Sequence, residues 1–117
     1  MPITGAHVLL FTPEAEALRA TLRDVIGWDF VEAHPGWPIF ALPPAELGVH
    51  PSDGETRHEL WLISDDLDAT VAGRRAKGVE FLGEPADDGF GRWLRMRLPG
   101  GVEVPLYEPK HPLAIDV

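Results

Sequence analysis

Residues 57–109 read RHELWLISDDLDATVAGRRAKGVEFLGEPADDGFGRWLRMRLPGGVEVPLYEP, and this stretch carries the clearest pattern of the chain. Arg57–Ile63 is a short apolar run between polar residues, which is typical of a strand. The next three residues, SDD, offer side-chain caps and early negative charge to a helix. We expect that helix to run to about Lys77, where Gly78 ends it.

Three further strands are expected after this helix. Glu80–Gly83 and Phe90–Leu98 are the first two, with a loop over Glu84–Gly89 between them. Phe90–Leu98 alternates between apolar and polar residues, as a half-buried strand does. The turn sequence PGG then leads into Val102–Glu108, and we expect Glu108 to lie at its solvent-exposed end. This half therefore reads strand, helix, strand, strand, strand.

The first half of the chain repeats this order more loosely. A short apolar run precedes Thr12, which can cap a helix that starts at Pro13. Gly27 stops that helix, and the polar stretch PSDGET (51–56) is the best linker in the chain. The expected strands of this half are Ala6–Phe11, Asp29–His34, Pro38–Pro43 and Glu46–His50.

The repeat can be checked by subtracting residue numbers. His7 and Glu59 each stand five residues before a helix cap and are separated by an offset of 52. The two helix-ending glycines, Gly27 and Gly78, are separated by 51. Similar offsets along the chain indicate an internal duplication.

We therefore expect an α+β fold in which two tandem βαβββ modules form a curved mixed sheet around a cleft. A four-stranded half leaves one sheet face uncovered, so two halves must pair. The chain is expected to be one domain over residues 1–117, with module 1 at about 5–51 and module 2 at about 57–109.

Composition excludes several classes of partner and chemistry. The 117 residues include 10 Lys and Arg against 19 Asp and Glu, which gives a net charge of −9. Such a chain is repelled by nucleic acid and by anionic membranes, so we expect neither as a partner. No cysteine is present, which excludes thiol catalysis and thiolate metal sites. We found no signal peptide, and the expected compartment is the cytoplasm.

The order of elements and three segments of the second half resemble the vicinal oxygen chelate superfamily. The segments are HELWLISDDLDATVAGRRAKGVEFLGEP, GFGRWLRMRLPGG and VEVPLYEP, and GAHVLLFTPEAEALRATLRDVIGWDF in the first half is similar more loosely. This superfamily contains glyoxalase I, bleomycin-resistance proteins and extradiol dioxygenases. The resemblance implies the fold, whereas the chemistry must be argued from the site.

The resemblance also implies where a divalent metal such as Ni, Zn, Mn or Fe would bind. Family ligands lie on the first and last strands of a module, and the first-strand position falls on His7 and Glu59. The last-strand position falls on Pro105 and Leu47, neither of which has a donor atom for a metal. The alternative is a buried pair in which the imidazole and the carboxylate hydrogen-bond each other.

Strand alternation gives the candidate lining of a ligand-binding cleft. Tryptophan rings would supply flat apolar walls, although plain core packing is the alternative for them. A guanidinium on the same face could hold a carboxylate or phosphate, and the alternative is an outer position paired with acidic residues. The candidate lining is Phe11, Trp61, Trp93, Arg95 and Tyr107.

Two functions of different classes follow from the resemblance. The first is a bleomycin-resistance-like protein that binds a small planar molecule in an apolar cleft without a complete metal site. The alternative is a metal-dependent lyase, isomerase or dioxygenase in which His7 and Glu59 hold an ion that polarises vicinal oxygens. A third possibility is a dimerisation or regulatory module. Short strands leave open sheet edges, so a homodimer is expected in either case.

Overall fold

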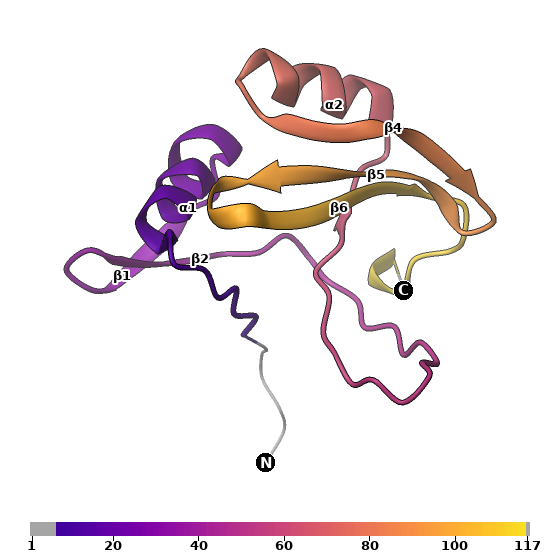
Figure 1. The fold of residues 1–117 in the computed structure, drawn as a ribbon, viewed down its shortest axis with the longest axis horizontal. Helices are drawn as coiled ribbons and strands as arrows, with labels where there is room; N and C mark the ends of the chain where they lie inside the picture. Colours follow the sequence, from indigo (N-terminus) through magenta and orange to yellow (C-terminus); the bar gives the residue numbers. More distant parts are fainter. Residues whose placement is uncertain (1–6, 117) are drawn as a thin grey trace.

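The second half of the chain forms a mixed four-stranded sheet with one helix on it (Figure 1). The computed structural model describes residues 7–116. In sheet order β3-β6-β5-β4, β3 pairs with β6 in parallel, whereas the other neighbours are antiparallel. The predicted α+β class and curved mixed sheet are confirmed. The elements are β3 (Leu62–Ile63), α2 (Leu67–Ala76), β4 (Glu80–Asp88), β5 (Gly91–Leu98) and β6 (Val102–Pro109).

Helix α2 is fixed at its start by two carboxylates. Asp66 is the N-cap, and its Oδ1 accepts a hydrogen bond of 3.1 Å from the backbone N–H of Ala69. Glu108, at the far end of β6, accepts a hydrogen bond of 2.9 Å from the backbone N–H of Leu67. Leu67 is 0% exposed and packs with Val71 one turn later, so the helix is pinned to the sheet by its first residue.

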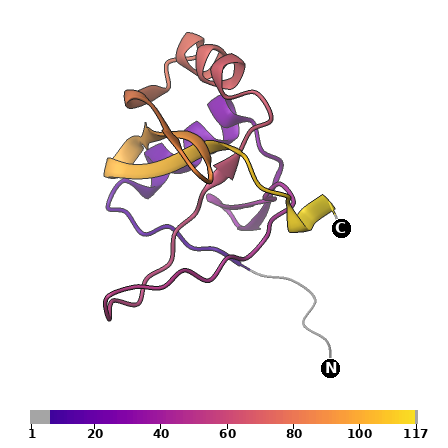
Figure 2. The ribbon, with the colours of Figure 1, turned by 90° about the vertical axis from the view of Figure 1, so that its right-hand side faces the viewer.

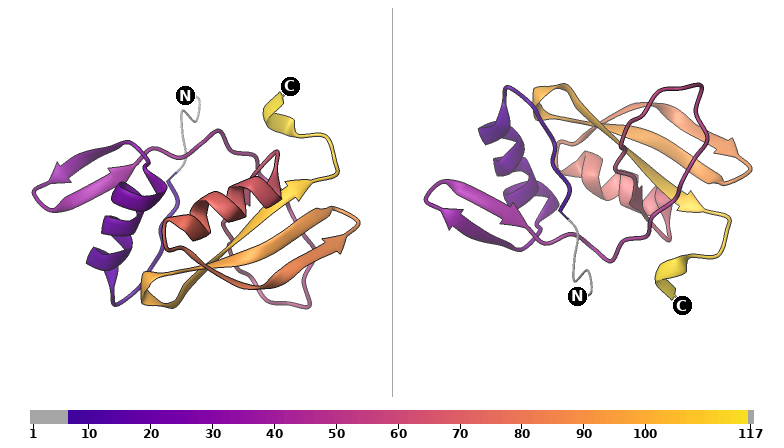
Figure 3. Two further views of the ribbon diagram at one scale, coloured as in Figure 1. Left: turned by 90° about the horizontal axis from the view of Figure 1, so that it is seen from above. Right: turned by 90° about the horizontal axis from the view of Figure 1, so that it is seen from below.

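The core lies between α2 and the sheet, and no α-helix of residues 7–116 covers the opposite sheet face. Along β5, Leu94, Met96 and Leu98 are buried, whereas Arg95 and Arg97 between them are exposed. This alternation places the aliphatic side chains toward α2 and the arginines on the other face. Figures 2 and 3 show α2 on one side of the sheet and the segment 41–61 on the other. The buried core comprises Leu18, Leu67, Val71, Val79, Phe81, Leu94, Met96, Leu98, Val104 and Leu106.

The first half contributes a helix and a hairpin. The helix predicted from Pro13 to Gly27 forms, but it begins at Ala15 with Glu14 rather than Thr12 as its N-cap, and its last turn is a π-helix. Two of the hydrogen bonds between the halves lie at this helix: Thr12 Oγ1 donates to the carbonyl of Gly100 at 3.1 Å, and Arg74 Nη1 donates to the carbonyl of Val25 at 3.1 Å. The elements are α1 (Ala15–Thr21), η1 (Leu22–Ile26), β1 (Phe30–His34) and β2 (Trp37–Phe40).

Two strands expected in the first half do not form among the described residues. Residues 7–11 and 41–50 have no regular secondary structure, and Ala6 lies outside the described residues. The physical reason is that a strand needs a neighbour for its backbone hydrogen bonds, and β1 and β2 pair only with each other. Their apolar side chains are left exposed, with Phe11 at 88%.

Two boundaries in the second half also differ from the prediction. The loop expected over Glu84–Gly89 was wrong: β4 continues to Asp88, with an irregularity in its pairing between Leu82 and Ala86. An irregularity of this kind lets a strand bend and then resume its pairing, so the polar residues that follow can remain part of the strand. The strand expected over Arg57–Ile63 is regular only at its last two residues.

Candidate functional site

Four aromatic side chains gather on the sheet face opposite α2, and we call them the aromatic cluster: Trp61, Phe90, Trp93 and Tyr107. The Trp61 ring lies at the centre, with centroid distances of 5.8 Å to Phe90, 5.3 Å to Trp93 and 5.4 Å to Tyr107. Its contacts with Phe90 and Tyr107 are edge-to-face, at 80° and 89°, and the contact with Trp93 is tilted at 52°. These are the geometries that aromatic rings prefer.

The sheet register explains why these rings meet. Trp93 on β5 stands directly across from Tyr107 on β6, and Ile63 on β3 stands on the other side of Tyr107. Trp61 precedes Ile63 by two residues and therefore points to the same face. Phe90 enters from the turn between β4 and β5.

Each indole N–H in the cluster donates to a carboxylate. Trp61 Nε1 bonds to Glu59 Oε1 at 2.9 Å, and Trp93 Nε1 bonds to Asp88 Oδ2 at 2.7 Å. Glu59 also accepts from Arg57 Nε at 3.0 Å. The hydrogen bonds from Trp61 and then Arg57 lower the pKa of Glu59 below its ordinary value, so this carboxylate carries its charge at neutral pH.

Arg95 lies at the rim of the aromatic cluster. Its guanidinium carbon is 4.9 Å from the centroid of the Trp93 ring, which is cation–π distance. Its Nε lies 3.9 Å from Glu103 Oε1 on β6, and both side chains are largely exposed. Arg95 therefore contacts the aromatic cluster and pairs with an acidic neighbour.

Tyr107 connects the aromatic cluster to the C-terminal segment. Its hydroxyl lies 3.3 Å from Nε2 of His111. Burial raises the pKa of Tyr107, and the nearby charge of Glu46 adds to this effect, so the phenol is neutral and able to donate. Glu46 itself accepts from the backbone N–H of Ala114, at the start of η3 (Ala114–Asp116).

The structure brings together four of the five residues predicted to line the cleft. Trp61 contacts both Trp93 and Tyr107 in the aromatic cluster, and Arg95 lies over Trp93 at its rim. Phe11 contacts no aromatic ring of the described residues. Phe90 was missed because the glycines on either side of it suggest only a turn. The role of Asp88 was missed because its partner depends on how β4 pairs with β5.

The two predicted metal ligands do not meet in this structure. His7 is exposed, and both carboxylate oxygens of Glu59 already accept hydrogen bonds. Among residues 7–116, no three His, Asp or Glu side chains are grouped closely enough to hold an ion. This donor set does not fit a chelated divalent metal, so we derive no chemistry through one; the assignment of His7 and Glu59 stays a prediction.

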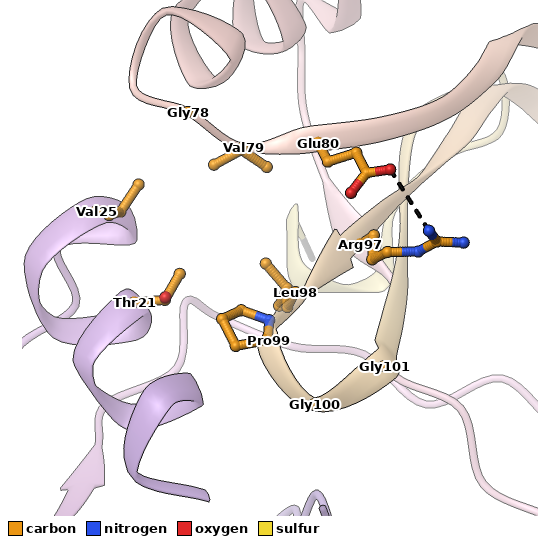
Figure 4. Close-up of a pocket in the computed structure, with 10 residues that line it drawn as sticks. All are labelled: Thr21, Val25, Gly78, Val79, Glu80, Arg97, Leu98, Pro99, Gly100 and Gly101. Atoms are coloured by element: carbon orange, nitrogen blue, oxygen red, sulfur yellow. Dashed lines mark hydrogen bonds and ion pairs between the residues drawn. The ribbon is translucent and has the colours of Figure 1, made fainter. Parts of the chain in front are cut away.

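A separate hollow of about 410 Å³ lies where the two halves meet (Figure 4). Thr21 and Val25 face it from the first half, and Val79 and Leu98 face it from the second. The charged groups on its lining are Glu80 and Arg97, which pair with each other at 3.5 Å. With its charges already paired, this hollow offers a ligand mainly apolar contact, and the aromatic cluster is the stronger candidate site.

Comparisons with solved structures place the fold of this chain. TnmS3, an antibiotic binding protein from Streptomyces sp. CB03234, is 26% identical over 93% of this chain and 100% of its own, with a TM-score of 0.63. A glyoxalase/bleomycin resistance protein from the same strain is 25% identical over 83% of this chain and 93% of its own, with a TM-score of 0.56. The chain has the fold of the vicinal oxygen chelate superfamily.

A third solved structure shares the vicinal oxygen chelate fold. It is a lactoylglutathione lyase from Agrobacterium tumefaciens, 19% identical over 92% of this chain and 94% of its own, with a TM-score of 0.64. No family model matches the sequence, and no curated protein matches it either. The resemblance predicted from the sequence is confirmed by these structures, which include both a binding protein and an enzyme.

Proposed function

We propose that this vicinal oxygen chelate protein binds a small planar molecule on the aromatic cluster, without a complete metal site. The observation that carries the proposal is the position of Trp61, whose ring contacts three other aromatic rings on the sheet face opposite α2. Rings set at steep angles to one another give a planar ligand one face to stack on and ring edges to touch. TnmS3 is described as an antibiotic binding protein, and its similarity over nearly the whole chain supports a binding role.

Intrinsic fluorescence tests this proposal, because two of the four tryptophans lie in the aromatic cluster. Titration with a panel of planar aromatic compounds should quench the protein, and Trp61→Leu should weaken binding at least about tenfold by removing stacking and apolar contact. Trp28→Leu is the matched control, since Trp28 lies between η1 and β1 in the first half and is partly buried. Equal losses in the two variants, or no quenching by any compound, would refute the proposal.

We also infer that a second copy of the chain completes the molecule, because too much surface is exposed. A compact chain of 117 residues exposes about 6,300 Å², whereas this one exposes 8651 Å². Full exposure of the residues outside 7–116 would account for at most about 1,100 Å² of the excess. The remainder, about 1,200 Å², exceeds the roughly 800 Å² that each partner buries in a standard interface.

The exposed apolar side chains show where the second copy would lie. They concentrate in the first half, where Leu47 and Val49 are each 92% exposed and Val31 is 68% exposed. We infer that this surface covers the aromatic cluster of the partner, which would return Phe11 to the cleft lining. Sedimentation should give a dimer, and Val31→Glu should shift it to monomer by placing a charge in the interface. A wild-type monomer at high concentration would overturn this inference.

The cytoplasm remains the proposed compartment. Among residues 7–116, no helix has the length and apolar composition of a membrane span. Fractionation of cells that produce the protein tests the compartment directly.

A further inference from the structure

We propose that the aromatic cluster selects a positively charged planar ligand. This inference rests on the proposed binding function and adds the charge of the ligand to it. The observation behind it is that both indole N–H groups of the aromatic cluster are bonded to carboxylates, Glu59 at Trp61 and Asp88 at Trp93.

A carboxylate bonded to an indole N–H changes what the ring face attracts. Negative charge at the nitrogen increases the electron density of the ring, and tryptophan is already the best aromatic partner for a cation. The same charge attracts a ligand cation directly at close range. Both effects act most strongly on Trp93, because the charge of Glu59 at Trp61 is partly offset by Arg57 at 3.0 Å. The centroids of the two rings are 5.3 Å apart. A planar cation that stacks on either ring therefore lies near a carboxylate.

The cations around the aromatic cluster are mostly committed to other groups. Arg57 is paired with Glu55 at 3.1 Å as well as with Glu59. Lys110 is paired with Asp87 and also donates to the backbone carbonyl of Asp88. Among residues 7–116, these pairs leave Arg95 as the cation at the cluster that a ligand would have to displace.

Arg95 already occupies the place that a ligand cation would take. Its guanidinium lies over the Trp93 ring at 4.9 Å, which shows that this ring face accepts a positive charge in the folded protein. The side chain is largely exposed, and its ion pair with Glu103 is long at 3.9 Å, so little holds it in place. A planar cation competes with Arg95 for the ring, and Arg95 remains beside Glu103 when it is displaced.

Three acridines of different charge test this selection by isothermal titration of the intact protein at neutral pH. N-methylacridinium carries a positive charge, acridine is uncharged and acridine-carboxylate is negative, while the ring system stays the same. We expect the cation to bind about tenfold more tightly than acridine, and the anion to bind most weakly. Equal binding of the cation and acridine would overturn the selection but leave the binding function standing.

Two further outcomes of this titration would count against the charge selection. Tightest binding of acridine-carboxylate would overturn the selection and make Arg95 an anion-binding residue. Failure of all three acridines to bind would count against the planar-ligand function and the selection together. The titration therefore separates the failure of the charge argument from the failure of the site.

Conservative variants identify the carboxylate that is responsible for the preference for a cation. Asp88→Asn keeps a hydrogen-bond acceptor for Trp93 and removes the charge, so the preference for N-methylacridinium over acridine should fall several-fold. Asp87→Asn is the matched control, because it removes the same charge from the adjacent residue, which pairs with Lys110 instead. An equal fall in both variants would assign the preference to the overall charge of the protein and overturn the proposal. Circular dichroism confirms that each variant is folded.

Replacement of Arg95, the competing cation, should change the affinity for the ligand in the opposite direction. Arg95→Gln should strengthen N-methylacridinium binding several-fold, since it frees the Trp93 ring face and removes a like charge. Arg97→Gln, two residues along the same strand, is the control because Arg97 pairs with Glu80. Weaker binding of N-methylacridinium by Arg95→Gln would contradict the competition.

Discussion

Removal of the Glu108 carboxylate should loosen the start of α2. In Glu108→Ala the backbone N–H of Leu67 loses a charged acceptor at 2.9 Å, in a partly buried position. A hydrogen bond to a charged group contributes about 1.5–3 kcal/mol, and a negative charge near a helix N-terminus adds about 0.3–1 kcal/mol. Partial exposure reduces both, so we expect the free energy of unfolding to fall by about 2 kcal/mol. For a domain of this size the melting temperature should fall by about 8 °C.

Urea unfolding followed by circular dichroism measures this loss, with Glu103→Ala as the matched control. Glu103 lies on the same strand and on the opposite, exposed face, so its removal should change stability by less than about 0.5 kcal/mol. Glu108→Gln should lie between the wild type and Glu108→Ala, because the amide oxygen still accepts the hydrogen bond without the charge. A loss in Glu108→Ala no larger than that in Glu103→Ala would refute the claim that this carboxylate anchors the helix.

Three more measurements test other features of the structure. Because hydrogen bonds lower the pKa of Glu59, this carboxylate adds stability above its unfolded pKa that is lost as the pH falls through the lower folded value, so Glu59→Gln should flatten the acid side of a stability-against-pH curve. Elemental analysis after dialysis against nickel, zinc, manganese or iron(II) should find less than one equivalent per chain; a full equivalent that His7→Ala abolishes would restore the metal hypothesis. Gly100→Ala should cost about 1–3 kcal/mol in urea unfolding, because φ is 83° and a Cβ atom would meet the Thr12 side chain, whereas Gly101→Ala at φ 73° meets nothing and should cost less.

Local patterns predict the second half of this chain well because its contacts are close in sequence. The strands of Phe90–Leu98 and Val102–Glu108 adjoin a PGG turn, and the alternation that marks them is a direct record of which face is buried. The same alternation placed Trp61, Trp93 and Tyr107 in the candidate cleft lining, and in the structure the Trp61 ring contacts the other two. Sequence periodicity can predict which side chains of a site share a face when the residues lie on adjacent strands.

The remaining differences arise where a residue depends on a distant partner. The apolar pattern of Ala6–Phe11 is the pattern of a strand, yet residues 7–11 are not paired, because pairing needs a neighbour that periodicity does not identify. Glu108 was expected at an exposed strand end, and instead it caps a helix that begins 41 residues earlier. The carboxylate partners of the tryptophans could not be predicted either, since they depend on side-chain geometry.

The parallel pairing of β3 with β6 has a consequence for how the protein folds. Strands β4, β5 and β6 follow one another through short turns, whereas Leu62 must find Leu106 across the whole of the intervening chain. Closing a loop of this length costs about 3 kcal/mol of chain entropy. Because its turns are short, the β4–β5–β6 meander can form at a lower entropic cost before β3 docks. Trp61 enters the aromatic cluster with β3, while Phe90 and Trp93 belong to the meander. A bound ligand that contacts both Trp61 and the meander would hold β3 against the rest of the sheet. It would stabilise the chain closure with the highest entropic cost in the second half and would therefore slow unfolding.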